Sequence, residues 1–249
     1  MFKHFFIAVI CLTGLAPVLT AADQIEIDGI TEPFKDVTLG LADPGLIHQQ
    51  FFKEGDSAKE GDVLLELDTR LQELEVGRRK AVMEQDKVVL DSTRELFQGT
   101  KSVSKQDLTK AEAEYDVASA EYAIAVEQLA DRRLVAPFSG NITEILLHPG
   151  AACAPYQSLV RLVDISRCYF VGHIDGVAAS SLHLDEPVKI TVAGGATVTA
   201  KICFISSTVD AASGLARIKA IFENADGKVR PGLAAKLTAE LSLWKVMTA

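Results

Sequence analysis

The pattern of apolar and polar residues divides the chain into stretches of different period. Short apolar runs of strand length, separated by turn residues, fill residues 37–68 and 134–164. Residues 69–133 between them carry a helical period, and residues 165–243 return to short runs. Alternating residues are typical of strands, and spacings of three and four are typical of helices. The pattern therefore predicts a β region with a helical insertion, followed by a second β region.

The two strand-rich stretches around the insertion resemble each other. Residues 45–55 lie over residues 140–150 when the chain is shifted by 95 positions, with glycine at both ends of each copy. The matched apolar pairs are Ile47 with Ile142, Phe52 with Leu147, Leu64 with Leu159 and Leu67 with Leu162. Each half is too small to bury its own apolar face, so we predict that the halves pack on each other as one β-sandwich.

The second half of the helical insertion has an unbroken heptad pattern, which predicts close packing against one partner helix. Its small and large residues alternate at spacings of three and four, in the order Leu108, Ala111, Tyr115, Ala118, Tyr122, Ala125 and Leu129.

The first half, from about residue 70 to residue 98, has a less regular apolar stripe that we expect to face this partner. The stripe consists of Leu71, Leu74, Ala81, Val82, Val88, Val89 and Leu96, and is interrupted by Arg78, Gln85 and Ser92. Because it is weaker than its mate, we expect the outer half of the hairpin to be looser or to be covered by a neighbouring subunit.

The turn between the helices carries signals for both helix ends. Gly99 predicts a left-handed cap that ends the first helix. Ser104, followed three residues later by Asp107, predicts a capping box that begins the second helix. At about 1.5 Å per residue, each helix extends roughly 40 Å, so the hairpin must project beyond the sandwich.

Residues 165–243 predict a small closed β-barrel, because closure removes exposed strand edges. We expect strands at residues 168–174, 188–192, 197–206 and 215–222, a short helix at 176–184, and a last strand that ends near residue 243.

Residues 1–22 read as a secretory signal. Lys3 and His4 precede a short apolar run, and small residues provide a cleavage site before Asp23. The run is shorter than the roughly 20 apolar residues that span a bilayer, which favours a cleaved signal. An uncleaved N-terminal anchor stays open as the alternative.

Composition argues against several functions. The net charge of −9 would repel phosphate backbones, so we expect no nucleic-acid partner. The four histidines after residue 22 lie far apart without ligand spacing, and no serine sits in a G-x-S-x-G turn. We therefore predict no metal site, no catalytic residue and no cofactor.

Three segments together resemble the membrane fusion proteins, which are the periplasmic adaptor subunits of bacterial tripartite efflux and type I secretion systems. They are FFKEGDSAKEGDVLLELD at residues 51–68, LVAPFSGNITEILLHPGA at 134–151 and DAASGLARIKAIFENADGKVRPGLAAKL at 210–237. The resemblance implies a mainly β, α+β fold with a split lipoyl-like β-sandwich, an inserted antiparallel coiled-coil hairpin and a β-barrel domain. The implied divisions are 1–22, 37–68 with 134–164, 69–133 and 165–243.

The resemblance also implies partners and a location. The expected partners are an inner-membrane transporter of the resistance-nodulation-division or ABC type, an outer-membrane channel and further copies of the chain in a ring, commonly of six. The protein is then expected in the periplasm in association with the inner membrane.

In this family the hairpin tip docks the channel through an arginine, a leucine and a serine. The sequence GTKSVSK matches at residues 99–105, so Ser104 corresponds to the serine. Phe97 stands at the leucine position and Thr93 at the arginine position, with Arg94 one residue out of register. The residues that the resemblance assigns to the docking tip are Phe97, Gly99, Thr100, Lys101, Ser102, Val103, Ser104 and Lys105.

Two other functions are alternatives to the adaptor, namely a lipoyl-type carrier and an envelope scaffold. A lipoyl-type carrier would need an exposed lysine at the turn that follows the first half-motif, but residues 66–70 contain none. An envelope scaffold that uses the hairpin only as a spacer remains open, because a spacer tolerates almost any solvated turn.

Overall fold

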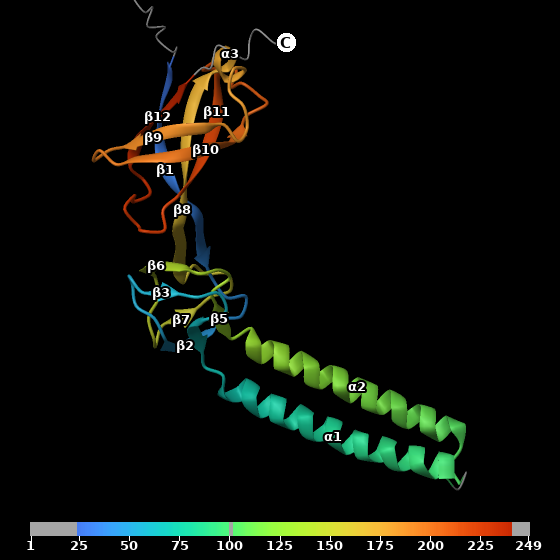
Figure 1. Cartoon of the computed structure of the whole chain (residues 1–249). Coiled ribbons are helices and arrows are strands. Elements are labelled where there is room, and N and C mark those ends of the chain that lie inside the picture. Colours follow the sequence, from blue (N-terminus) through green and yellow to red (C-terminus); the bar gives the residue numbers. More distant parts are fainter. Residues whose placement is uncertain (1–23, 100–101, 241–249) are drawn as a thin grey trace, which may run out of the picture.

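The computed structural model describes residues 24–99 and 102–240 and forms a column of two β units with a helical arm at its base (Figure 1). The predicted secretory signal and the predicted end of the last strand near residue 243 lie outside the described residues. In the described part of the chain, no helix is both long enough and apolar enough to cross a bilayer.

The lower β unit is built from the two matched stretches. Its strands are β2 (Gly45–Gln50), β3 (Ser57–Ala58), β4 (Val63–Leu67), β5 (Arg133–Val135), β6 (Gly140–Ile145) and β7 (Ala152–Cys153). One sheet has the order β5-β4-β2-β7, and β3 and β6 belong to the other. The lower halves of β1 (Gln24–Leu39) and β8 (Val160–Asp175) complete that second sheet.

The internal repeat is visible as a reciprocal exchange of hydrogen bonds between the two halves. Gly55 donates its backbone N–H to the carbonyl of Ile142, and Gly150 donates to the carbonyl of Ile47, both at 2.8 Å. Both glycines have φ near +90°, a conformation that only glycine adopts readily. The matched residues Ile47 and Ile142 are both buried. Each half is thus completed by the other, as the sequence predicted.

The upper β unit is a closed antiparallel barrel. Its strands follow the order β1-β12-β9-β10-β11-β8, and β8 pairs back with β1. The bounds of the remaining elements are β9 (Pro187–Val192), β10 (Thr197–Ile205), β11 (Leu215–Glu223), β12 (Ala234–Glu240) and α3 (Gly176–Ala179). The short helix is smaller than the predicted 176–184, because Asp175 caps it and the chain turns at Ser180.

Two long strands join the units. β1 and β8 are antiparallel partners from Gly29–Gly172 in the barrel down to Leu39–Val160 in the sandwich. The register shifts between Pro33 and Lys35, where the ring of Phe34 lies under the guanidinium of Arg167 at 3.7 Å. The sequence pattern does not predict residues 24–36 as part of the barrel, because they precede the motifs that indicate both β units.

The arm consists of α1 (Arg70–Gly99) and α2 (Lys105–Ala130), which leave the base of the sandwich side by side (Figure 1). β4 leads into α1 and α2 returns into β5, so the arm is inserted between the two halves of the sandwich. The fold class predicted from the sequence is therefore confirmed.

Close packing in the barrel depends on two facing glycines. Gly29 of β1 lies opposite Gly172 of β8, and the ring of Phe170 covers both. A Cβ at Gly172 would lie 2.8 Å from Cε1 of Phe170, and one at Gly29 would meet the backbone oxygen of Val171. An aromatic ring that covers strand glycines restores the apolar contact that they lack.

We expect Gly29→Ala to lower the free energy of unfolding by about 1–3 kcal/mol, because a methyl group there overpacks against backbone that cannot move aside. The matched control is Gly77→Ala on the open surface of α1, where an added Cβ meets no atom within 4 Å. That control should stabilise by about 0.5–1 kcal/mol, since alanine is the better helix former. Urea unfolding of both variants measures this, and equal effects would contradict the packing account.

Candidate docking arm and its tip

The α2 side of the arm packs as its heptad pattern predicts. Ala111, Ala118 and Ala125 are buried, and the four large residues of the pattern are half-buried. Alanine every seven residues lets the two helices approach closely, while the tyrosine and leucine side chains fill the spaces at either side.

The prediction for α1 was wrong, because the apolar stripe faces away from α2. Leu71 and Leu74 are each 73% exposed, and Val82, Val88, Val89 and Leu96 are also exposed. The residues of α1 that are buried or half-buried follow a different heptad pattern, namely Gln72, Val76, Arg79, Met83, Asp86, Leu90, Thr93 and Phe97, together with Glu75. The recurrence of Val76, Met83, Leu90 and Phe97 at every seventh position is the signal that could have identified this face.

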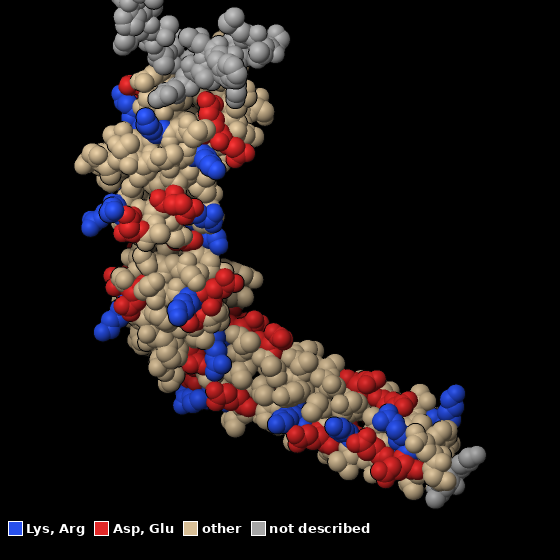
Figure 2. Space-filling view, in the orientation of Figure 1, with Lys and Arg blue, Asp and Glu red and all other residues tan. Residues whose placement is uncertain are grey.

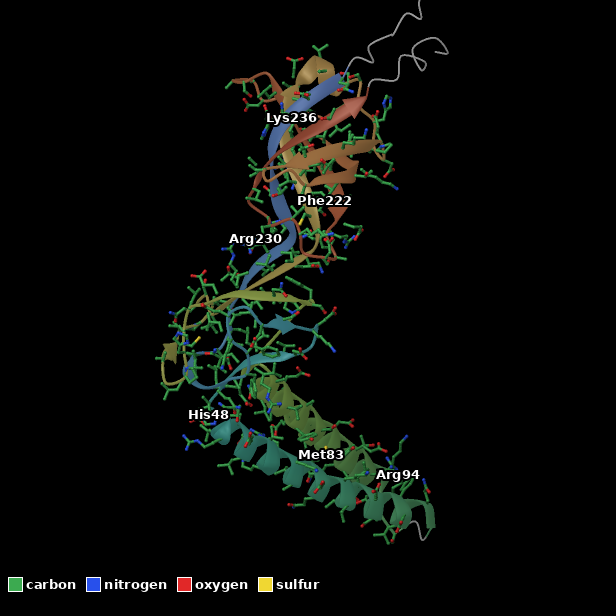
Figure 3. All side chains as sticks on the ribbon, turned by 60° about the vertical axis from the view of Figure 1, so that its left-hand side comes forward. His48, Met83, Arg94, Phe222, Arg230 and Lys236 are labelled. Carbon is green, nitrogen blue, oxygen red and sulfur yellow. The ribbon has the colours of Figure 1, made fainter. Side chains whose placement is uncertain are left out.

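Polar residues on this inner face of α1, and the exposed Arg94 beside it, find partners on the arm. Arg79 contacts the carboxylate of Glu121 on α2 and also donates to Glu75 at 2.8 Å. Nearer the tip, Nη2 of Arg94 lies 3.4 Å from Oε1 of Glu112 on α2. Figure 3 shows Met83 and Arg94 along α1, and Figure 2 shows charges of both signs along the arm. These pairs show which levels of the two helices lie side by side.

Glu75 is held as a carboxylate by two arginines. The hydrogen bond from Arg78, followed by that from Arg79, lowers the pKa of Glu75 to about 2. The hydrogen bond to Glu75 in turn raises the pKa of Arg79.

At the tip, the predicted capping box is present, and it uses the side chain of Ser104. The hydroxyl of Ser104 accepts the backbone N–H of Asp107 at 3.1 Å, and the Asp107 carboxylate accepts the backbone N–H of Ser104 at 3.2 Å. The hydroxyl of Ser104 also donates to this carboxylate, and these hydrogen bonds lower the pKa of Asp107. The side chain assigned to docking is therefore already engaged in beginning α2.

The other residues assigned to the tip differ in how exposed they are. Ser102 and Lys105 are exposed and Val103 is half-buried, whereas Thr100 and Lys101 lie outside the described residues. Phe97 is half-buried on the face toward α2. Gly99 ends α1 as predicted, but its φ is not in the left-handed region, so the left-handed cap was a wrong prediction. Gly99 is the last residue of the helix.

The positions that correspond to the family arginine are also engaged within the arm. Thr93 is half-buried, and its hydroxyl donates to the carbonyl of Val89 at 2.7 Å. Arg94 pairs with Glu112 as described above. The Arg94 guanidinium is thus paired on the exposed surface of the arm in the isolated chain.

Metal-ligating side chains do not gather in the described part of the chain. There, no three His, Cys, Asp or Glu side chains lie close enough to hold a metal ion. Cys153 and Cys168 are buried free thiols, and burial raises the pKa of Cys168 to about 11, while Cys203 is exposed. At the turn where a lipoyl lysine would stand, Asp68 is paired with Arg70 at 2.6 Å.

Comparison with known proteins gives one curated relative and several solved structures. No family model matches the chain. An uncharacterised protein of Haemophilus influenzae is 25% identical over 222 residues, which cover 87% of this chain. The chain spans only 57% of the length of that relative.

The solved structures share the fold. A MacA–MexA chimera with the Pseudomonas aeruginosa MexA α-hairpin domain matches with a TM-score of 0.79 and 20% identity, over 89% of this chain and 83% of the chimera. The membrane fusion protein Spr0693 of Streptococcus pneumoniae matches with a TM-score of 0.69 and 14% identity, over 86% of this chain and 97% of that protein. ZneB of Cupriavidus metallidurans matches with a TM-score of 0.54 and 21% identity, over 88% of this chain and 98% of ZneB. The arm, sandwich and barrel thus recur together in this order in proteins of very different sequence.

Removing the cap should loosen the tip. We expect Ser104→Ala to lower the stability of the arm by about 1 kcal/mol, because the backbone N–H of Asp107 loses its acceptor. Ser102→Ala, two residues earlier and outside the capping box, should have a smaller effect. Amide hydrogen exchange of the first turn of α2 measures the change, and equal exchange in the two variants would contradict it.

Acid should weaken the arm through Glu75. Because its pKa is lowered from 4.5 to about 2 on folding, its pairing stabilises the folded state above pH 4.5 and is lost as the pH falls toward 2. Thermal unfolding followed by circular dichroism should show a smaller acid-induced loss in Glu75→Gln than in the native chain. Glu84→Gln on the same helix serves as the control and should retain the native loss.

Proposed function

We propose that this chain, which has the fold of the membrane fusion proteins, is a periplasmic adaptor that links an inner-membrane transporter to an outer-membrane channel. The observation that carries the proposal is the placing of a long arm and a barrel at opposite ends of one column (Figure 1). A protein built in this way can contact two partners that are far apart.

The geometry supports a connecting role over a catalytic one. The helices of the arm span roughly 40 Å at about 1.5 Å per residue, which is long compared with the sandwich that holds them. β1 and β8 run through both β units, so arm and barrel are joined by two covalent connections and not by a loose linker. We propose that the chain performs no reaction and carries no cofactor, and that it forms part of an export conduit.

We propose an orientation for the case in which the N-terminal segment is an uncleaved anchor. Gln24 pairs with Glu240 at the end of the barrel that is remote from the arm. If the segment before Gln24 holds the protein at the inner membrane, the barrel faces the transporter and the arm points toward the outer membrane. The transporter would be of the resistance-nodulation-division or ABC type.

Several copies are needed for a tight contact with one channel. A single tip offers few exposed side chains, whereas copies arranged in a ring bind the same channel with a high effective concentration. We propose a ring, with six as the number the resemblance implies. The docking contact would come from residues 99–105, where Ser102 and Lys105 are exposed and the hydroxyl of Ser104 is engaged in the capping box.

Crosslinking from the tip in intact cells tests this function. A photo-reactive amino acid at Lys105 is expected to capture an outer-membrane channel, because that side chain is exposed at the tip. The same group at Lys80, which is exposed far from the tip on α1, should not capture it. Capture of no channel from Lys105 in a folded, exported chain would favour the envelope spacer instead.

A further inference from the structure

The connection between the barrel and the sandwich is narrow, because β1 and β8 are the strands that run through both units (Figure 1). Their pairing is interrupted where the register shifts between Pro33 and Lys35. Three residues of β8, at positions 165–167, lie there opposite the single residue Phe34. An irregularity of this kind interrupts the hydrogen-bonded ladder and bends the strand pair. The column is therefore weakest against bending at this level.

On each side of the shift, the strand pair is fastened within one unit. On the barrel side, the buried hydroxyl of Thr31 accepts the backbone N–H of Leu233, in the loop between β11 and β12, at 3.1 Å. On the sandwich side, Arg161 of β8 donates two hydrogen bonds, of 2.8 and 2.6 Å, to the carboxylate of Asp36 on β1. A change of angle between barrel and sandwich is thus concentrated in the few residues between Thr31 and Asp36.

Aromatic rings and cations alternate across this shift. On the sandwich side, Nζ of Lys35 lies 4.7 Å from the ring centroid of the buried Phe138 and 5.8 Å from that of Phe34. The guanidinium of Arg167 lies 3.7 Å from the Phe34 centroid. The rings of Phe34 and Tyr169 are 5.6 Å apart. Cations within about 6 Å of a ring centroid are attracted to the ring face.

The series continues into the barrel through β11. Nζ of Lys219 lies 5.4 Å from the ring centroid of Tyr169 and 3.7 Å from Oε2 of Glu32 on β1. The contacts therefore lead without a gap from the core of the sandwich to a strand that belongs to the barrel alone. We call this set the waist ladder; it consists of Phe138, Lys35, Phe34, Arg167, Tyr169 and Lys219.

The central contacts of the waist ladder lie on one face of the strand pair. Glu32 and Tyr169 are cross-strand partners, so their side chains point to the same side, and the ring of Phe34 lies beside that of Tyr169. Phe34, Arg167 and Tyr169 are all half-buried, so their contacts are partly withdrawn from water. Bending that opens this face must separate rings from cations.

We propose that the waist ladder is a brace that sets the angle between barrel and sandwich, with Phe34 and Arg167 as its positioning residues. While their contact holds, the two units move as one body and the arm keeps a fixed direction relative to the barrel. When it is lost, the column bends at the register shift, away from the braced face. This inference concerns a single chain and does not rest on the proposed ring or partners.

Pulsed electron spin resonance tests the brace through the distance between the two units. In the full chain with Cys11→Ser and Cys203→Ser, the two remaining native thiols are buried. Spin labels are attached to Lys53→Cys on the sandwich and Thr199→Cys on the barrel, at positions that are exposed in the native chain. We expect one narrow distance distribution for this protein.

Two further substitutions weaken the brace, and a third is the matched control. Arg167→Gln should raise the population outside the native distance peak by about three- to tenfold, the range for the loss of one half-buried cation–π contact. Phe34→Leu removes the ring that several members share and should raise this population further. Arg217→Gln removes a guanidinium 5.5 Å from the Phe204 ring, within the barrel alone, and should leave the distribution at its native width.

Circular dichroism of the same samples separates bending from unfolding. A broader distribution in Arg167→Gln with a native spectrum supports the brace, and this variant decides the matter if Phe34→Leu does not fold. Native distributions in both variants would overturn the proposal, as would equal broadening in Arg217→Gln or broadening that occurs only with loss of the native spectrum. Since no channel or transporter takes part in the measurement, the adaptor function is tested separately.

Discussion

The structure depends on the reciprocal pairing of the two half-motifs. Gly55 and Gly150 exchange hydrogen bonds with the opposite half, so neither half has a complete sheet without the other. The halves are separated in sequence by the whole helical insertion, and they meet only if α1 and α2 run antiparallel and return the chain to its starting point. The sandwich therefore closes only when the arm forms. The position of the tip relative to the barrel follows from this dependence.

Features that recur in the sequence could be predicted from it. Features that depend on which of several possible contacts is favoured could not. The repeat predicted the sandwich because Ile47 and Ile142 occupy matching positions in the two halves, and both must be buried where the halves pack on each other. The heptads of α2 revealed its inner face because alanine alternates there with tyrosine and leucine. For α1, apolar content favoured the wrong face, since the pattern cannot show that Arg79 pairs with Glu121. The φ of Gly99 depends on where the turn begins, and the sequence does not specify that position.

The candidate site illustrates the same limit. Alignment to the tip motif placed Ser104 among the docking residues, and capping rules placed it at the start of α2; the structure shows that its hydroxyl performs the second role. A hydroxyl with two hydrogen bonds inside its own turn offers little to a partner. In the proposed docking, a contact at the tip would then come from exposed neighbours such as Ser102 and Lys105.

The paired strands β1 and β8 give the column a preferred direction of bending. Two covalent strands held edge to edge by hydrogen bonds resist bending within the plane of their ribbon, because one strand would have to stretch and the other to shorten. Bending out of that plane requires only small torsional changes, and it is easiest where the register shifts between Pro33 and Lys35. A displacement that begins at the barrel would accordingly reach the far end as a swing in one plane, with the length of the arm acting as a lever.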